Sequence, residues 1–355
     1  MIKKPPLKKK KFINSINYFR GLAIVIIVLG HCFDLAQWNV SNNFEIFVHN
    51  LSLNGTVYFV FISGFLYYHI FYQRFNYKKF MSKKMQYVLL PYILISLVPI
   101  VLVVFSGSGH SENFPVELNN KPLLAIIWYF VTGKIINAYW YIPMAMLLFA
   151  VSPIVNLIVK SDKIIEVFLL LLPISLIVHR PLDNLNALHS LIYFFPVYIL
   201  GIWSSINNEA IYRYLRGNAK KIVTVILVVV LGLIQVLVFK QAGNFHKDFW
   251  TITVLDVNLI QKILLCFLFM SILDKYENTN YKLVNKIAET SFAIYFIHPF
   301  LIKISNNLLS KFNISYQGNF FTLILTTSMV IIASMTIAFG IKAILKKNSR
   351  YLIGW

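Results

Sequence analysis

The chain has 355 residues, of which 58% are hydrophobic, 16% aromatic and only 13% charged. A soluble protein of this composition would expose more apolar surface than its few polar side chains could cover, so a soluble fold is excluded and lipid is the expected solvent. The net charge of +20 could indicate nucleic-acid binding, but Lys and Arg also gather in the cytoplasmic loops of membrane proteins, so their positions along the chain decide between the two.

The amino-terminal residues 1–17 form a basic leader that is followed directly by an apolar run. This order resembles a signal peptide, but no small-residue cleavage pattern follows and the run is long, so we expect an uncleaved first helix. Runs of roughly 17 to 25 apolar residues are long enough to cross a bilayer as helices. Ten such runs are expected, at residues 18–38, 52–73, 86–106, 139–159, 164–179, 188–206, 222–239, 250–272, 287–307 and 320–341.

The distribution of basic residues predicts how the spans are oriented across the membrane. With the amino terminus in the cytoplasm, 25 of the 33 Lys and Arg residues fall in cytoplasmic segments, seven fall outside, and Lys262 falls within a span. This bias predicts that both termini are cytoplasmic, and no nucleic-acid partner is expected. The sequence therefore predicts an all-α polytopic membrane protein with about ten transmembrane helices. A single transmembrane domain at 18–345 is expected to lie between the leader and a cytoplasmic tail at 346–355.

Two features fall outside this simple pattern of spans. The apolar segment 123–131 is too short to cross, so we expect it to lie at the outer interface or to dip into the membrane beside the loop at 107–138. Cys32 and Cys266 both lie in apolar runs, so they are expected to be small core residues rather than a disulfide or a pair of metal ligands.

Ionisable residues at membrane depth are functional candidates, because charge is costly in the hydrocarbon core. Arg20 and His31 are related by helix geometry: at ~100° per residue, eleven residues return the chain to within about 20° of the same face, roughly 16 Å further along the axis. One helix face is thus expected to carry both groups. The structural alternative makes Arg20 a cytoplasmic anchor and His31 a hydrogen-bonded core histidine. The other candidates are Asp34, Asp256, Lys262 and His298.

Several short motifs succeed one another along the predicted helices. They are Arg20-Gly-Leu-Ala with Gly30-His31, Ser63-Gly64-Phe65, Lys84 with Leu90-Pro91-Tyr92, Tyr139-Trp140-Tyr141, the segment 195–201, and Ser291 to Tyr295 with His298-Pro299. In this order they resemble the acyltransferase-3 family of bacterial membrane O-acyltransferases, over essentially the whole chain. Within that family the chain resembles the transferases of exopolysaccharide and surface-glycan clusters that consist of the membrane domain alone. One departure is the basic pair Lys83 and Lys84, where members often carry Arg, because Lys cannot make the same bidentate phosphate contact.

The resemblance implies transfer of an acyl group from cytoplasmic acyl-CoA to a hydroxyl of a surface or lipid-linked polysaccharide, with acetyl preferred over succinyl. It places His31 at the catalytic histidine of the family, either as a general base or as a transiently acylated nucleophile. Arg20 is then expected to bind donor phosphates at the inner mouth, and Lys84 to belong to the same donor site. Asp34 is expected to orient the His31 ring, unless it is a carboxylate of the outer interface.

The remaining predicted site residues each have a structural alternative. Ser63 and Gly64 are expected to allow close helix packing against the first span, in preference to a direct contact with an oxyanion. Tyr139 and Trp140 fit an interfacial aromatic belt better than a sugar-stacking surface. His298 is expected either to make a structural hydrogen bond or to belong to the site. No histidine spacing typical of a metal site occurs, so we expect no metal and no bound cofactor, with acyl-CoA as the donor substrate.

A polysaccharide exporter or flippase is the rival prediction, in which the same polar residues would line a translocation path and no donor would be consumed. Transporters often contain inverted repeats, and the lack of a visible repeat in the sequence favours the enzyme; a non-catalytic scaffold comes third. The expected partners are acyl-CoA, a glycan acceptor, membrane lipid and other membrane proteins of polysaccharide synthesis. The expected location is the cell (cytoplasmic or inner) membrane, which the chain would cross several times.

Overall fold

The computed structural model describes residues 12–107 and 109–355, and these residues are almost entirely helical. Residues 1–11, which make up most of the predicted basic leader, lie outside the described residues. The two strands of the described chain, β1 (Arg180–Pro181) and β2 (His246–Lys247), have two residues each and pair in parallel. The all-α fold predicted from composition and hydropathy is therefore confirmed for the described residues.

Sixteen α-helices form the described part of the chain, and short 3-10 or π turns extend or join several of them. One such turn, η5 (Asn137–Trp140), leads directly into α7. The helices are α1 (Asn14–His31), α2 (Asn43–Ser52), α3 (Thr56–Leu66), α4 (Tyr77–Lys84), α5 (Leu90–Ser106), α6 (Pro122–Thr132), α7 (Tyr141–Ala150), α8 (Ser152–Lys160), α9 (Ile164–Val178), α10 (Ala187–Ile206), α11 (Asn208–Leu215), α12 (Asn218–Leu237), α13 (Val257–Asp274), α14 (Lys282–Lys311), α15 (Phe320–Leu345) and α16 (Ser349–Ile353).

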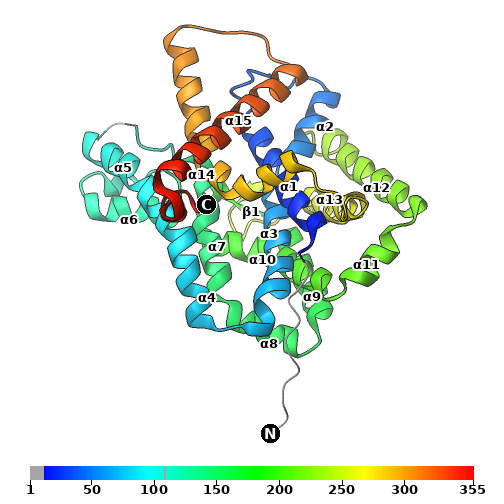
Figure 1. Ribbon diagram of the computed structural model, residues 1–355. Coiled ribbons are helices and arrows are strands. Elements are labelled where there is room, and N and C mark those ends of the chain that lie inside the picture. The colour runs from blue at the N-terminus through cyan, green and yellow to red at the C-terminus, as the bar shows by residue number, and fades with distance from the viewer. Residues whose placement is uncertain (1–11, 108) are drawn as a thin grey trace.

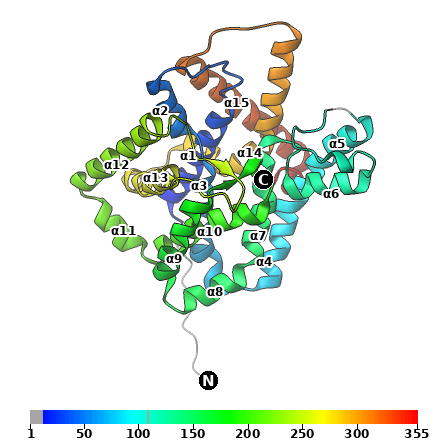
Figure 2. The ribbon, with the colours of Figure 1, turned by 180° about the vertical axis from the view of Figure 1, so that it is seen from behind.

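The helices are arranged around α1, α3 and α10, which lie near the middle of the molecule (Figure 1). In both views α5 and α6 lie at one edge and α11 and α12 at the opposite edge (Figure 2). The central helices are buried because their side chains are apolar nearly all round; Phe19 on α1, Phe61 on α3 and Phe194 on α10, for example, have no exposed surface. A helix that is apolar on every face needs protein or lipid on every face.

Seven helical segments of the described chain are long and apolar enough to cross a membrane, or eight if the bent pair α6 and α7 counts as one span. Neither α1 nor α9 is among the seven, and α9, at 15 residues, is shorter than the roughly 20 residues that a bilayer requires. Every one of the ten predicted runs contains a helix, but the count of ten and the orientation of the termini stay predictions. The seven segments are Asn43–Arg74, Tyr77–Ser106, Ala187–Ile206, Asn218–Leu237, Val257–Asp274, Lys282–Lys311 and Phe320–Ile353.

Two predicted boundaries are wrong, and in both places a local hydrogen bond explains the difference. The run predicted at 250–272 becomes helical only at Val257, because the Asp256 carboxylate caps α13 by accepting a hydrogen bond from the backbone N–H of Leu259 at 2.9 Å. The run predicted at 18–38 ends as a helix at His31, where the backbone N–H of Cys32 donates to Leu29 and a series of turns begins.

The short apolar segment predicted at 123–131 forms α6, which begins at Pro122. It is followed by a sharp turn, and α6 is bent by 76° from the helical segment Asn137–Ala150. The turn passes through Gly133, whose φ of +69° lies in the left-handed region where glycine is favoured. This geometry is that of a broken span or a re-entrant loop, and it brings η5 and α7 to the centre of the bundle.

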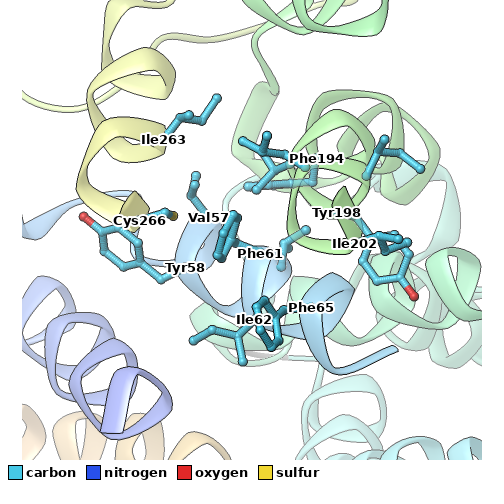
Figure 3. Close-up of a cluster of buried hydrophobic side chains, with 14 of the residues drawn as sticks. Val57, Tyr58, Phe61, Ile62, Phe65, Phe194, Tyr198, Ile202, Ile263 and Cys266 are labelled. Carbon is cyan, nitrogen blue, oxygen red and sulfur yellow. The ribbon is translucent and has the colours of Figure 1, made fainter. Parts of the chain in front are cut away.

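A reciprocal pair of glycines brings the two central helices α3 and α10 together. A Cβ atom at Gly64 would overlap the carbonyl oxygen of Tyr198, and one at Gly201 would overlap the carbonyl oxygen of Phe61. The two backbones therefore approach as closely as small residues allow, as in tightly packed membrane helices. The aromatic side chains around the crossing, Phe61 and Phe194 among them, interlock to form the main apolar core (Figure 3).

We expect the predicted orientation of the spans to appear in reporter fusions. Because basic residues accumulate on the cytoplasmic side, fusions after Lys84, Lys221 and Lys286 should report a cytoplasmic position, and fusions after His110 and Phe245 an extracytoplasmic one. Alkaline phosphatase and a fluorescent protein, which are active on opposite sides of the inner membrane, provide the two readouts. Reversed signals at two or more of these positions would contradict the ten-span arrangement.

Candidate active site

A cavity of about 540 Å³ is lined by residues of α1, α3, α4, α7, α14 and the segment 349–355. Its volume is within the range of about 300 to 1,000 Å³ that is typical of small-molecule sites. Apolar atoms form most of the surface of the wall, and about half of the lining residues carry a polar or charged group. The cavity contains both predicted residues of the first helix, Arg20 and His31.

The helix α1 carries Arg20 and His31 past the cavity, and α14 runs beside it in the same direction. At one end the Nε–H of Arg20 donates to the carbonyl oxygen of Ala288 at 2.9 Å. At the other end the rings of His31 and His298 lie together, with centroids 5.4 Å apart. The two helices thus remain in register over the eleven residues between Arg20 and His31, roughly 16 Å.

His298 is held in one orientation by its own helix. Its Nδ1 lies 2.9 Å from the carbonyl oxygen of Ile294; since a carbonyl can only accept, the ring proton is on Nδ1 and Nε2 carries a lone pair. Nε2 is buried and has no hydrogen-bond partner among the described residues. The structural hydrogen bond expected of His298 is therefore present, whereas His298 does not line the cavity itself and its role in the site stays a prediction.

Arg20 reaches the cavity with most of its hydrogen-bonding capacity unused. Only Nε makes a hydrogen bond within the described part of the chain, so the two Nη groups are available to a ligand. Glu289 also lines the cavity and interacts electrostatically with Arg20, but the two form no ion pair. A guanidinium with free Nη groups can bind phosphate or carboxylate oxygens in pairs.

Lys84 lies on the cavity wall against an aromatic cluster. Its Nζ is 4.1 Å from the ring centroid of Phe149 and 5.2 Å from that of Phe80. These rings attract the ammonium group by cation–π interactions, which fix a positive charge at the wall without neutralising it. Lys83, the next residue, does not line this cavity and is exposed.

The Ser63-Gly64 motif divides between packing and the cavity. Gly64 makes the close helix contact described above, whereas the half-buried Ser63 lines the cavity one position earlier on α3. Close packing is therefore found at Gly64, but against α10 and not against the first span as predicted. Ser63, Thr56 and Ser291 are the residues with an aliphatic hydroxyl group in the described lining.

The two aromatic residues of η5, Tyr139 and Trp140, make different contacts. The buried Tyr139 does not line the cavity, and its hydroxyl donates to the carbonyl oxygen of Phe296 at 2.7 Å. The hydroxyl of Tyr295 donates in return to the carbonyl oxygen of Ala138 at 2.6 Å. This exchange fastens η5 to α14. Trp140 and the next residue, Tyr141, do line the cavity, so the alternative of a sugar-stacking surface stays open for Trp140 and not for Tyr139.

Asp34 is not brought to the cavity. It is exposed in the turns that follow α1, and no hydrogen bond within the described residues joins it to His31. The prediction that Asp34 orients the ring assumed a helix that continues to residue 38, but the helix ends at His31. The group that the structure places against the ring is His298, from another helix.

Asp256 and Lys262, two further ionisable candidates from the sequence, have separate partners. Asp256 caps this helix and accepts a hydrogen bond from the Tyr193 hydroxyl at 2.8 Å. The Lys262 ammonium donates to the carbonyl oxygens of Asn50 and Leu51, at 2.8 and 2.9 Å, and so caps the end of α2. Both residues have structural partners and lie outside the cavity.

Sequence reasoning missed three charged residues around the site: Glu289, Arg350 and Arg180. Glu289 and Arg350 line the cavity directly. The guanidinium of Arg180 lies over the indole of Trp140, 4.6 Å from the ring centroid. Its Nη2 donates a hydrogen bond to Oδ1 of Asn184 at 2.6 Å. Burial in the loop after α9 lowers the pKa of Arg180 to about 10, which leaves it charged at neutral pH.

No sequence pattern distinguished these residues, because all three resembled ordinary charges of loops or of the membrane interface. Their roles depend on which helices meet in three dimensions. Within the described residues, no group of three or more His, Cys, Asp or Glu side chains is placed to hold a metal ion. The two cysteines are buried and unpaired, and neither lines the cavity.

Comparison with known proteins gives one match. The family model described as an acyltransferase domain matches residues 13–341, which include every helix from α1 to α14 and most of α15. None of the curated proteins and none of the solved structures compared with the chain matches it. Because the family match covers most of the chain, including the helices that carry Arg20, His31 and His298, the protein belongs to the acyltransferase-3 family and is a membrane acyltransferase.

Proposed function

We propose that the protein transfers an acetyl group from cytoplasmic acetyl-CoA to a hydroxyl of a surface or lipid-linked polysaccharide in the cell membrane. The observation that carries this proposal is the cavity itself, which is lined by cationic side chains, Arg20 among them, and by His31, whose ring is backed by His298. This arrangement suits a donor whose negative charges and reactive carbonyl are far apart. The membrane acyltransferase activity rests on the family; the donor, the acyl group and the acceptor are the proposal.

The length of the cavity supports a donor with a long flexible arm. Arg20 and His31 are roughly 16 Å apart along α1, so a ligand that touches both must extend over that distance. A CoA thioester does so, since its phosphates are separated from the thioester by the pantetheine arm. With the phosphates at Arg20 and Lys84, the thioester carbonyl would reach His31.

The chemistry at the far end requires a proton acceptor, because a sugar hydroxyl is a poor nucleophile until its proton is removed. In the proposed step His31 takes that proton while the sugar oxygen attacks the thioester carbonyl. The carbon–sulfur bond breaks, and the departing thiolate is protonated to give free CoA. The proton returned to sulfur comes from His31, so the histidine ends in its starting state.

His298 is suited to position His31 for this step. Its Nε2 is a buried acceptor, so it favours the His31 ring with an N–H toward α14 and a free nitrogen toward the cavity. This is a positioning role, comparable to the carboxylate that orients histidine in hydrolytic triads. It replaces the role that the sequence assigned to Asp34.

The donor end is tested by replacing Arg20. We expect Arg20→Ala to raise the apparent KM for acetyl-CoA by about 10-fold or more, since a charge-assisted hydrogen bond contributes about 1.5–3 kcal/mol. The value of kcat should change much less, and Arg20→Lys should recover part of the loss. The measurement is release of free CoA by purified protein with a glycan acceptor and varied acetyl-CoA.

Arg213→Ala provides the matched control, because Arg213 is exposed on α11 and does not line the cavity. An unchanged KM in Arg20→Ala would remove Arg20 from the donor site. If the wild-type protein released no CoA with any acceptor, yet glycan export still required it in cells, the exporter would be the correct function. Labelled protein isolated after acetyl-CoA alone would indicate an acyl-histidine intermediate instead of general-base catalysis.

A further inference from the structure

The segment that follows α15, predicted as the cytoplasmic tail 346–355, turns back onto the bundle. The reversal occurs at Lys346, which has a φ of +50°, and leads through η7 (Lys346–Asn348) into α16. This short helix packs against α5, α14 and α15, and Ile353 is only 2% exposed. In Figure 1 the segment is the red coil beside α14. Residues 349–355 are called the C-terminal wall below.

Several contacts fix the C-terminal wall in place. Gly354 has a φ of +70°, and a Cβ atom there would overlap the ring of Phe292, so only glycine allows this approach to α14. The Trp355 ring packs edge-on against Phe339, with centroids 5.1 Å apart, and the Lys342 ammonium lies 3.5 Å from the centre of the Trp355 ring. The wall is thus a packed part of the fold.

The C-terminal wall contributes three residues to the cavity: Arg350, Gly354 and Trp355. The Arg350 guanidinium lies 5.4 Å from the ring centroid of Tyr87, which also lines the cavity. No ion pair neutralises Arg350 among the described residues, and it joins Arg20 and Lys84 as the cationic groups of the described cavity lining. The only acidic side chain of that lining is Glu289.

These residues lie beyond the region shared with the family, because the family match ends at residue 341. The geometry points to a role in donor recognition: we propose that Arg350 binds a phosphate group of the donor and that Tyr87 and Trp355 provide aromatic surface for its heterocyclic ring. This inference rests on the proposed function, since it names the part of the chain that holds the head group of an acyl-CoA. It makes the C-terminal wall a determinant of donor affinity.

The physical basis is the charge of the head group. CoA carries a pyrophosphate and a ribose phosphate, more negative charge than Arg20 and Lys84 can neutralise together. A third cation at the mouth adds a charge-assisted contact, and arginine suits it because its planar guanidinium can bind phosphate oxygens while stacking on Tyr87. The exposure of Arg350 at the cavity mouth leaves it accessible to the ligand.

The test uses free CoA as the probe, so that binding is measured without turnover. We expect Arg350→Gln to weaken CoA binding to the purified, detergent-solubilised protein by roughly 10-fold and to reduce the salt dependence of the dissociation constant. Arg350→Lys should retain most of the affinity. Lys347→Gln is the matched control, because it removes the same charge from an exposed neighbour that does not line the cavity.

A second pair of variants tests the wall independently of its charge. Gly354→Ala should force the segment away from Phe292 and weaken CoA binding, whereas Gly340→Ala, at a glycine with nothing within 4 Å of a new Cβ, should leave binding unchanged. Wild-type affinity and salt dependence in Arg350→Gln would overturn the inference; the proposed function would still stand if Arg20→Ala raised KM in the same preparation. Failure of the wild-type protein to bind CoA would overturn both.

Discussion

Replacing His31 by Gln is expected to lower the rate of acyl transfer by at least about 100-fold, the lower end of what general acid–base catalysis contributes. Gln is similar in size and retains a hydrogen-bonding end, but it cannot take up a proton from the acceptor hydroxyl. The ring of His31 lines the cavity and lies beside His298, with centroids 5.4 Å apart, so the loss should appear in kcat with little change in the KM for acetyl-CoA.

The measurement requires purified protein in detergent or nanodiscs, labelled acetyl-CoA and a glycan acceptor, with protein amount and membrane insertion compared with the wild type. His110→Gln is a suitable control, since His110 lies in the loop after α5 and does not line the cavity. If His31→Gln kept most of its transfer activity, His31 would not be the catalytic group. If it lost glycan export in cells without any change in acylation, the exporter would replace the transferase as the function.

The second large effect concerns stability: Gly64→Ala and Gly201→Ala should each destabilise the protein by about 3 kcal/mol, toward the upper end of the usual cost of overpacking. Each new methyl group would overlap a backbone carbonyl oxygen of the facing helix, at Tyr198 for Gly64 and at Phe61 for Gly201. A backbone atom cannot rotate away as a flexible side chain can, so α3 and α10 would have to separate along their length.

Unfolding in a graded series of denaturing detergent, followed by tryptophan fluorescence, would measure this loss. Gly340→Ala on α15 is the control, because nothing lies within 4 Å of the added Cβ; it should be neutral or stabilise by up to about 1 kcal/mol through helix propensity. Unfolding of Gly64→Ala at the wild-type midpoint would show that the two helices can move apart at no cost.

The sequence predicted the helices well where a single property decides them. Apolar runs locate helices because lipid and core both demand apolar surface, and each of the ten runs contains one. The shared position of Arg20 and His31 on the cavity wall follows from the periodicity of one helix, a local property. The ends of helices were less predictable. A single hydrogen bond that Asp256 accepts sets the start of α13, and the turn after His31 sets the end of α1.

The rest of the site depends on contacts between segments far apart in the sequence. The contact between His31 and His298 requires the register of α1 against α14, which Arg20 helps to set through the carbonyl oxygen of Ala288. Arg350 belongs to the cavity only because the chain reverses at Lys346. Neither register nor reversal leaves a periodic pattern in one sequence, and so the predicted partner of His31 was its near neighbour Asp34.

The side-by-side course of α1 and α14 makes the cavity a molecular ruler. The distance between its two ends is fixed because α1 and α14 cannot slide past each other. Arg20 is hydrogen-bonded to the carbonyl oxygen of Ala288 at one end, and the ring of His31 contacts that of His298 at the other. A small activated acyl compound, such as an acyl phosphate, is too short to be anchored by its charge and still present its carbonyl some 16 Å away. With the proposed donor site, the protein would select its donor by length as well as by charge, and acyl compounds of other lengths would be poor substrates.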